Sequence, residues 1–317
     1  MSKKFKALLL TGIVALGVVG CSKKESVESN DKFKATLVLS TGGVNDQSFN
    51  QSAWEGALKA KEEYGIEVSY LESNTEADYQ SNIETAIDQD SDLVIGIGYQ
   101  VGESILEASK LYPEQRFVAV DSTFDVSLEN LRTVKFSEEE AGYLTGLIAG
   151  KMTESNVLGC VGGFDIPSLT PFFEGFEKGA KEANQDVKVL KQYINSFADS
   201  AKAKVVAKQM EKEGADIIFT ACGGGNTGVI EVAREGKGVK IIGVDMPMNY
   251  IAPEHIITSA LKNVGEGIKL TIKDTLDGNF NGGNEVKYNL SNNGVGYEKT
   301  NLLPNEVIEF VESKINK

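Results

Sequence analysis

The chain has 317 residues, of which 41% are hydrophobic and 25% charged, and its formal net charge is −14. This composition excludes a disordered chain, the length predicts roughly two domains, and the negative charge argues against nucleic-acid binding. One histidine and three cysteines argue against His-based metal sites, a Ser-His-Asp triad and a disulfide scaffold.

The first residues have the pattern of a secretory signal. Lysines precede an apolar run over residues 7–19, which is shorter than the roughly 20 residues that span a membrane. The run ends Val18-Val-Gly-Cys21, which resembles a bacterial lipobox, in which the cysteine is lipidated. A plain signal peptide or an uncleaved anchor is the alternative. We expect a signal peptide over 1–20, lipidation of Cys21 and a flexible tether over 21–32, with the body held at the extracytoplasmic face of the cell membrane.

From residue 33 onward, short apolar runs alternate with helical patterns. In the first half we predict strands at 35–40, 67–71, 93–97 and 116–120, separated by helices at 51–64, 77–89 and 102–111. In the second half we predict strands at 157–161, 187–193, 216–220 and 239–244, separated by helices at 172–183, 200–213 and 227–234. Val- and Ile-rich runs between helices are typical of parallel strands that are covered on both faces.

The two halves repeat one pattern. The strands that follow Asp92 and Asp216 resemble each other, as do those that end at Asp121 and Asp245, with equal spacing along the chain. Generic α/β units can agree by chance, but the equal spacing favours two similar lobes. We therefore predict an α/β fold with two doubly wound parallel-sheet lobes joined by crossover strands.

The tail completes these lobes. We predict strands at 255–261 and 285–290, helices at 264–276 and 304–315, and crossings between lobes at 131–136 and 255–261. We assign 33–136 and about 246–280 to lobe 1, 137–245 and about 281–303 to lobe 2, and 304–317 to a C-terminal helix. Sites in such sheets lie beyond the carboxyl ends of the strands, so facing lobes would share one cleft for a small molecule.

The loop after the first predicted strand holds the first candidate ligand-binding residues, which are Asn45, Asp46, Phe49 and Asn50. Two glycines before them permit a tight turn and a close approach of the backbone to a ligand. The alternative is local: Asp46 or Ser48 caps the following helix and Phe49 acts as a hydrophobic staple.

Two aspartates and a lysine end strands that point to the same cleft. Carboxylates at Asp121 and Asp245 could accept hydrogen bonds from sugar hydroxyls, and Lys262 could supply a cation. Helix or turn caps are the alternative for the aspartates, and a solvated surface position is the alternative for the lysine.

In the second half, Phe197 interrupts a polar loop and could stack on a flat ligand, opposite Phe49. A place in a small core under its loop is equally compatible with the sequence. Gly223 and Gly224 could bring backbone N–H groups close to a ligand. The stretches 96–102 and 222–228 lack the spacing of dinucleotide or phosphate loops, so we interpret both as tight turns at the cleft wall. Cys160 and Cys222 have the setting of buried thiols.

These residues resemble the basic membrane protein family, whose members are substrate-binding lipoproteins similar to the purine-nucleoside-binding components of ABC importers. The resemblance runs from about residue 33 to the C-terminus and is most specific at 43–51, Gly-Val-Asn-Asp-Gln-Ser-Phe-Asn-Gln. It also rests on the lipobox, on the strands that end at Asp121 and Asp245, and on Ser259-Ala-Leu-Lys262.

The resemblance implies a type I periplasmic-binding-protein fold that holds a purine nucleoside between its lobes. It implies that Phe49 and Phe197 sandwich the purine, that three side chains bond the base edge and that four residues hold the ribose. The base-edge residues are Asn45, Asp46 and Asp121, and the ribose residues are Asp245, Lys262, Gly223 and Gly224. The implied partners are a nucleoside such as adenosine, guanosine or inosine, an ABC permease and the membrane.

We expect a monomeric binding protein with no catalytic residues, no metal and no cofactor. A lipoprotein that binds a pentose or another small sugar is the main alternative, since it would use the same two aspartates without an aromatic sandwich. A nucleoside hydrolase is the enzyme alternative, with Asp46 or Asp121 as base, but no cluster of aspartates has metal-ligand spacing.

Overall fold

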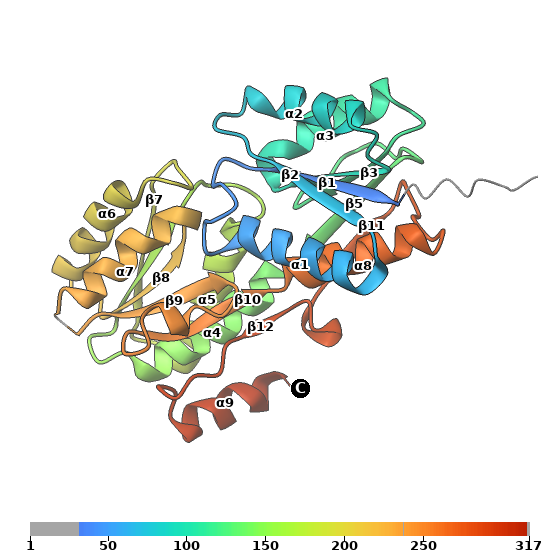
Figure 1. The fold of residues 1–317 in the computed structure, drawn as a ribbon. Helices are drawn as coiled ribbons and strands as arrows, with labels where there is room; N and C mark the ends of the chain where they lie inside the picture. Colours follow the sequence, from blue (N-terminus) through green and yellow to red (C-terminus); the bar gives the residue numbers. More distant parts are fainter. Residues whose placement is uncertain (1–31, 237, 316–317) are drawn as a thin grey trace, which may run out of the picture. The chain divides into compact units, whose positions relative to one another are not determined.

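The computed structural model describes residues 32–236 and 238–315. The predicted signal peptide, Cys21 and nearly all of the predicted tether lie outside the described residues. The described part is built on two six-stranded sheets flanked by helices (Figure 1). We call the half built on the first sheet lobe 1 and the half built on the second sheet lobe 2.

Lobe 1 is a doubly wound unit in which neighbouring strands pair in parallel. Its apolar strands are buried because helices cover both faces of the sheet, α2 and α3 on one and α1 and α8 on the other (Figure 1). The strands in spatial order are β11 (Glu285–Tyr288), β5 (Leu131–Phe136), β4 (Arg116–Val120), β3 (Leu93–Ile97), β1 (Lys34–Leu39) and β2 (Glu67–Leu71). The helices are α1 (Phe49–Tyr64), α2 (Asp78–Asp88), α3 (Tyr99–Leu111) and α8 (Val264–Leu276).

Lobe 2 repeats this plan, with one antiparallel strand at its edge. The strands in spatial order are β12 (Val295–Tyr297), β10 (Ile256–Lys262), β9 (Lys240–Asp245), β8 (Ile217–Ala221), β6 (Val157–Gly162) and β7 (Lys188–Tyr193). The helices are α4 (Glu138–Met152), α5 (Thr170–Ala183), α6 (Ser200–Lys212), α7 (Asn226–Arg234) and α9 (Asn305–Ile315). Helices α4 and α5 pack together, as do α6 and α7, and α9 contacts α4.

The repeat that the sequence predicts is present in the strand order. Strands β4-β3-β1-β2 of lobe 1 correspond to β9-β8-β6-β7 of lobe 2. The backbone conformation repeats as well, since Asp121 and Asp245 both have a φ of 64° at the carboxyl ends of equivalent strands. Aspartate is one of the few residues other than glycine that tolerates this left-handed conformation.

The tail departs from the lobe assignment expected from the sequence. We expected 246–280 in lobe 1 and 281–303 in lobe 2, but β10 pairs with β9 in lobe 2 and β11 pairs with β5 in lobe 1. An apolar run predicts that a strand forms, but it does not say which of two similar sheet edges the strand joins. Within the described residues the chain thus passes between the sheets after β5, after β10 and between β11 and β12. The first two crossings directly follow the segments that we predicted as crossings, and those segments are themselves strands, β5 of the first sheet and β10 of the second.

Helix α4 has no counterpart among the predicted elements. Its buried side chains lie on all sides, so no apolar stripe with helical spacing marks it. Glycines bring it unusually close to α5. A Cβ atom on Gly146 would lie 2.1 Å from the carbonyl oxygen of Phe176, and one on Gly142 would lie 2.1 Å from that of Phe172. The two helices therefore pack backbone against backbone.

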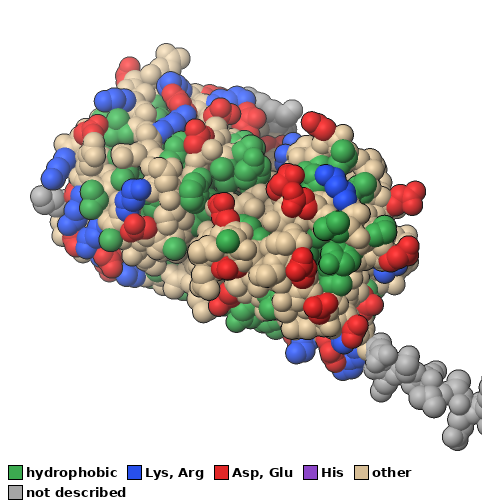
Figure 2. All heavy atoms as spheres, turned by 90° about the horizontal axis from the view of Figure 1, so that it is seen from above, with side chains coloured by type: hydrophobic (Ala, Val, Ile, Leu, Met, Phe, Trp, Pro, Cys, Tyr) green, Lys and Arg blue, Asp and Glu red, His purple; other side chains and the backbone are tan. Residues whose placement is uncertain are grey.

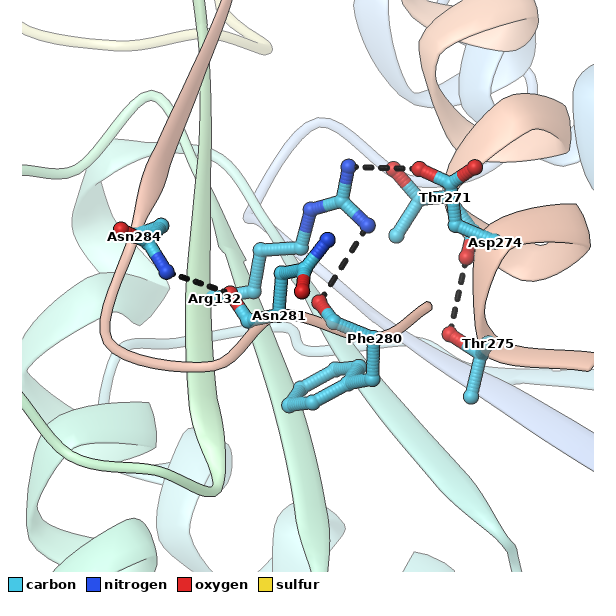
Figure 3. A network of polar contacts seen from close by, with 7 residues as sticks. All are labelled: Arg132, Thr271, Asp274, Thr275, Phe280, Asn281 and Asn284. Atoms are coloured by element: carbon cyan, nitrogen blue, oxygen red, sulfur yellow. Dashed lines mark hydrogen bonds and ion pairs between the residues drawn. The ribbon is translucent and has the colours of Figure 1, made fainter. Parts of the chain in front are cut away.

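A buried arginine ties together the parts of lobe 1 that adjoin the crossings (Figure 3). Arg132 in β5 is 3% exposed, and its Nη2 lies 2.7 Å from Oδ2 of Asp274 in α8. Its Nη1 donates a hydrogen bond of 3.3 Å to the carbonyl oxygen of Phe280, and Asn284 donates to the carbonyl oxygen of Asn281 in the same loop. Strand β5, helix α8 and the loop before β11 are thereby held to one another.

Charged side chains are mixed over the surface that Figure 2 draws. Acidic side chains are spread across this face, and Lys and Arg side chains are interspersed among them. On this face the acidic side chains are not gathered into a single patch.

Candidate functional site

A cavity lies where the carboxyl ends of strands from both sheets meet. The space between protein atoms there is about 610 Å³, counted up to and including its opening to solvent. Eight of the ten ligand-binding residues expected from the sequence line it: Asp46, Phe49, Asn50, Asp121, Phe197, Gly223, Asp245 and Lys262. Asn45 is exposed and Gly224 is half-buried, and neither lines the cavity. The structure thus brings together most of the predicted site.

Asp46 has the capping role that the sequence offered as its alternative, and it lines the cavity as well. Its Oδ1 accepts hydrogen bonds from the backbone N–H groups of Ser48 and Gln51, at 2.9 and 3.1 Å, and its Oδ2 accepts one from that of Asn50 at 2.9 Å. Burial raises the pKa of the carboxyl, and these backbone donors lower it. The first turn of α1 is therefore fixed by a carboxylate that is itself part of the cavity wall.

Phe49 and Asn50 are positioned by this same turn. Phe49 begins α1 beside Gly98, where a Cβ atom would lie 3.3 Å from the Phe49 ring. The side chain of Asn50 accepts a hydrogen bond of 3.1 Å from the Ser40 hydroxyl and donates one of 3.3 Å to the Ser40 carbonyl oxygen. Asn50 therefore fixes the carboxyl end of β1, and Phe49 is held against the loop that follows β3.

Asp245 forms a direct hydrogen bond between the lobes, because the Ser48 hydroxyl of lobe 1 donates to its Oδ2. Burial raises the pKa of Asp245 to about 7, although the charge of Lys262 and the Ser48 bond lower it. Its counterpart Asp121 binds Lys262 through Oδ2, and Oδ1 is buried with no hydrogen-bond partner in the described part of the chain. Burial raises the pKa of Asp121 to about 6. The charge of Glu138 also raises this pKa, whereas the charge of Lys262 lowers it.

Lys262 is not the solvated surface lysine that the sequence allowed, since its side chain is 2% exposed. Its Nζ lies 2.6 Å from Oδ2 of Asp121 and 2.7 Å from Oε1 of Glu138. It also lies 5.1 Å and 5.2 Å from the centres of the Phe49 and Phe136 rings, within the range of cation–π interactions. Burial alone would lower its pKa, but the surrounding carboxylates raise it above the usual value.

The wall from lobe 2 is built around Phe197. Its half-buried ring lies 5.1 Å from that of Phe164, centre to centre. Two glycines leave room for it: a Cβ atom on Gly163 would lie 2.2 Å from the ring, and one on Gly223 would lie 2.7 Å from the Phe197 carbonyl oxygen. Gly223 has a φ of 57°, which also favours glycine. The sequence had left Phe197 open between a small core under its loop and the cleft, and the residue lines the cavity while it also packs against the buried core.

Sequence reasoning missed two parts of the site. The first is the loop after β6 with the start of α5, from which Ile166, Ser168, Leu169 and Phe172 line the cavity. The internal repeat could have revealed it, because this loop corresponds to the predicted loop at 45–50 of lobe 1. The second is Glu138, which was missed together with α4. A serine followed three residues later by a glutamate, Ser137 and Glu140, was the available signal for the start of that helix.

The cysteines in the described part, Cys160 and Cys222, are buried free thiols, as we predicted. Burial raises the pKa of Cys222 to about 12, which keeps its thiol protonated. Within residues 32–236 and 238–315 no group of three or more His, Cys, Asp or Glu side chains is placed to hold a metal ion. None of the helices in that part combines the length and apolarity needed to cross a bilayer.

Two α/β lobes joined by several crossings, with a cavity between the carboxyl ends of their strands, define a solute-binding protein of the type I periplasmic-binding fold. A solved structure supports this class: an ABC transporter solute-binding protein from Aeropyrum pernix K1 is 28% identical, with a TM-score of 0.78. The similarity covers 90% of this chain and 86% of that one.

The family described as ABC transporter substrate-binding protein PnrA-like (Bmp) matches residues 33–317. The chain therefore belongs to this family. It is 34% identical to the ABC transporter nucleoside-binding protein BmpA of Lactococcus lactis, over 93% of this chain and 91% of that protein. It is 38% identical to basic membrane protein A of Borreliella burgdorferi, over 92% of this chain and 86% of that protein. Its relatives and its fold are those of solute-binding proteins rather than enzymes.

Proposed function

We propose that the cavity holds a purine nucleoside between aromatic side chains of the two lobes, and that the loaded protein delivers it to the permease of an ABC importer. The observation that carries the proposal is that Phe49 of lobe 1 and Phe197 of lobe 2 line one cavity together with Asp121 and Asp245. Stacking on aromatic rings contributes about 1–3 kcal/mol per base. Carboxylates accept the hydrogen bonds that ribose hydroxyls and base N–H groups donate. The name of the Lactococcus lactis relative supports the same ligand class.

The charges favour an uncharged ligand. Among the residues that line the cavity, Lys262 is the only cation, and two carboxylates already bind it. A phosphate group would meet the carboxylates of Asp46, Asp121 and Asp245 with no free cation to offset them. We infer that nucleosides bind and that their monophosphates are excluded.

Two residues require movement if they act as the family resemblance implies. Asn45 would bond the base edge with Asp46 and Asp121, and Gly224 would help to hold the ribose, yet neither lines the cavity. A nucleoside that bridges the lobes stabilises whichever arrangement gives it the most contacts, so binding can draw these loops inward. This movement is part of the proposal.

Calorimetric titration of residues 33–317 tests the ligand. The titrants are inosine, guanosine, adenosine, cytidine, ribose and inosine monophosphate. We expect purine nucleosides to bind, the monophosphate not to bind, and Phe49→Ala and Phe197→Ala each to weaken binding by about 1–3 kcal/mol. Tyr112→Ala is the control, since Tyr112 is an exposed aromatic residue that does not line the cavity. Tight binding of ribose without binding of any nucleoside would refute the proposal in favour of the pentose alternative.

We also propose that Cys21 carries a lipid that holds the protein at the extracytoplasmic face of the cell membrane. The support is the sequence Val18-Val-Gly-Cys21 after a basic and apolar leader. Cells that express the full chain should incorporate labelled palmitate into it and retain it in the membrane fraction, whereas Cys21→Ser should lose both properties. Retention and labelling of the variant would contradict the anchor.

A further inference from the structure

The ion cluster at the cavity has a member that does not line the cavity. Glu138 is the first residue of α4, directly after the first crossing from lobe 1 to lobe 2. Its side chain is 6% exposed, and its Oε1 lies 2.7 Å from Lys262 Nζ. Because it is absent from the cavity wall, it acts on a ligand through the wall residues Lys262, which it contacts, and Asp121, whose pKa its charge raises.

We propose that Glu138 is a positioning residue for ligand binding: it holds the Lys262 ammonium so that one carboxylate oxygen of Asp121 stays free for a hydrogen-bond donor of the ligand. The inference rests on the proposed function, because the donor is a nucleoside N–H or O–H group. It assigns a role to a residue that neither lines the cavity nor belongs to the predicted site.

The geometry of the ammonium is the first argument. Lys262 Nζ has three N–H donors, and two carboxylate oxygens lie within hydrogen-bond distance of it, Oδ2 of Asp121 at 2.6 Å and Oε1 of Glu138 at 2.7 Å. Without Glu138, the remaining contacts of this ammonium would be Asp121 and aromatic rings. With Asp121 as its remaining carboxylate partner, the Lys262 ammonium would move to a position between Oδ1 and Oδ2 of Asp121.

The unpaired oxygen of Asp121 is the second, independent observation. Oδ1 is buried and has no hydrogen-bond partner among the described residues, although its residue lines the cavity. A buried acceptor without a partner is costly, and a ligand that donates to it removes that cost. Glu138 keeps this oxygen available because it binds the Lys262 ammonium on a second side and so holds it away from Oδ1.

The charge of Glu138 affects the pKa of Asp121, which can be measured separately from ligand binding. The charged groups that act on Asp121 are Lys262 of β10, Glu138 of α4 and Lys135 of β5, and Asp121 in turn acts on Asp245 of β9. Glu138 raises the pKa of Asp121, which burial has brought to about 6. Removing its charge lowers that pKa, so the ionised form that accepts a hydrogen bond persists to lower pH. A side chain that served only for packing would not move this midpoint.

The experiment compares wild type with Glu138→Gln, Glu138→Asp and Glu139→Gln. Glu139 is the matched control, because it is the next residue of the same helix turn but is 58% exposed in a surface ion pair with Lys178. Inosine affinity is measured by calorimetry from pH 5 to pH 8. The titration of the Asp121 carboxyl is measured by carbon NMR without ligand.

We expect Glu138→Gln to weaken inosine binding at pH 7 by about 10- to 100-fold, the range of one charge-assisted hydrogen bond, and to lower the Asp121 midpoint. Glu138→Asp keeps the charge on a shorter side chain, so its midpoint should stay near that of wild type while its affinity remains reduced. Glu139→Gln should match wild type in both measurements.

An unchanged inosine affinity in Glu138→Gln would overturn the proposal, whether or not the Asp121 midpoint shifts. If Glu138→Gln does not fold, the affinity of Glu138→Asp decides, and a wild-type affinity there would overturn it. Failure of the proposed function looks different: wild type would not bind inosine or any other nucleoside, while the ligand-free NMR titration would still show whether Glu138 acts on Asp121.

Discussion

Replacing Lys262 by methionine isolates what its ammonium contributes, because methionine keeps an unbranched side chain and removes the charge. The carboxylates that lie 2.6 and 2.7 Å from Nζ belong to side chains that are 5% and 6% exposed, so water cannot replace the ammonium. Breaking one buried ion pair costs about 3–5 kcal/mol. Since one ammonium serves two carboxylates here, we expect a loss in the free energy of unfolding near the upper end of that range at pH 8.

The loss should depend on pH with a definite sign. With Lys262 present, the pKa of Asp121 is about 6, above its usual value of 3.8. Without Lys262 this pKa rises further, because the charge of the lysine lowers it. A folded-state pKa above the unfolded one means that the folded protein binds the extra proton. Stability is then retained at low pH and lost as the pH rises through the folded pKa. The gap between wild type and Lys262→Met should therefore be smaller at pH 5 than at pH 8.

Urea unfolding at pH 5, 6, 7 and 8 measures both quantities. Trp54, the single tryptophan, contacts Tyr70 with ring centres 4.8 Å apart and reports on lobe 1, while circular dichroism reports on both lobes. The control is Lys269→Met, because this lysine on α8 forms surface ion pairs that are worth at most about 1 kcal/mol. An equal loss at pH 5 and pH 8 would refute the reasoning, since uncompensated carboxylates cannot produce it.

Three further predictions concern stability and use the same unfolding assay. The free energy of unfolding of Asp245→Asn, relative to that of wild type, should increase as the pH rises from 3.8 to about 7, because the raised pKa of Asp245 destabilises wild type over that window. Parallel curves of stability against pH for the two proteins would contradict this. Gly146→Ala should lower the free energy of unfolding by about 1–3 kcal/mol, because the added Cβ atom would lie 2.1 Å from a carbonyl oxygen of α5. Gly296→Ala, whose Cβ atom would lie in open space, should lower it little, and equal losses would contradict the close packing of α4 on α5. The free energy of unfolding of Arg132→Met should fall by about 1–3 kcal/mol, because the Phe280 carbonyl oxygen loses its donor; a loss that shrinks markedly at high salt would contradict a buried hydrogen bond.

The strands of the fold could be predicted well from the sequence. Strands β2, β3 and β4 have the predicted bounds. For β3 and β4 the reason is that a parallel strand covered on both faces is a continuous apolar run between polar ends. The sheet to which a late strand belongs could not be predicted in the same way. Strands β10 and β11 fit either lobe by composition, and only tertiary packing places β10 beside β9 and β11 beside β5.

The candidate site followed from the repeat more than from any single motif. Asp121 and Asp245 were found because equal spacing marked them as equivalent, and both line the cavity with the same backbone conformation. Glu138 was missed because α4 is buried on all sides and carries glycines, so it lacks the amphipathic spacing that reveals a helix. A residue that acts on the cavity through another side chain leaves little trace in sequence spacing.

The last crossing of the chain has a consequence for the order of assembly. Strand β11 closes one edge of the first sheet and β12 closes one edge of the second, and both lie within the last 33 residues of the chain. Until they are in place, β5 and β10 present unpaired N–H and C=O groups, which is the situation that favours association of nascent chains. Contacts this distant along the chain also form slowly. A chain that emerges from its N-terminus onward would therefore keep both lobes unfinished until β11 and β12 have emerged, and removal of the segment that holds both strands would open both sheets at once.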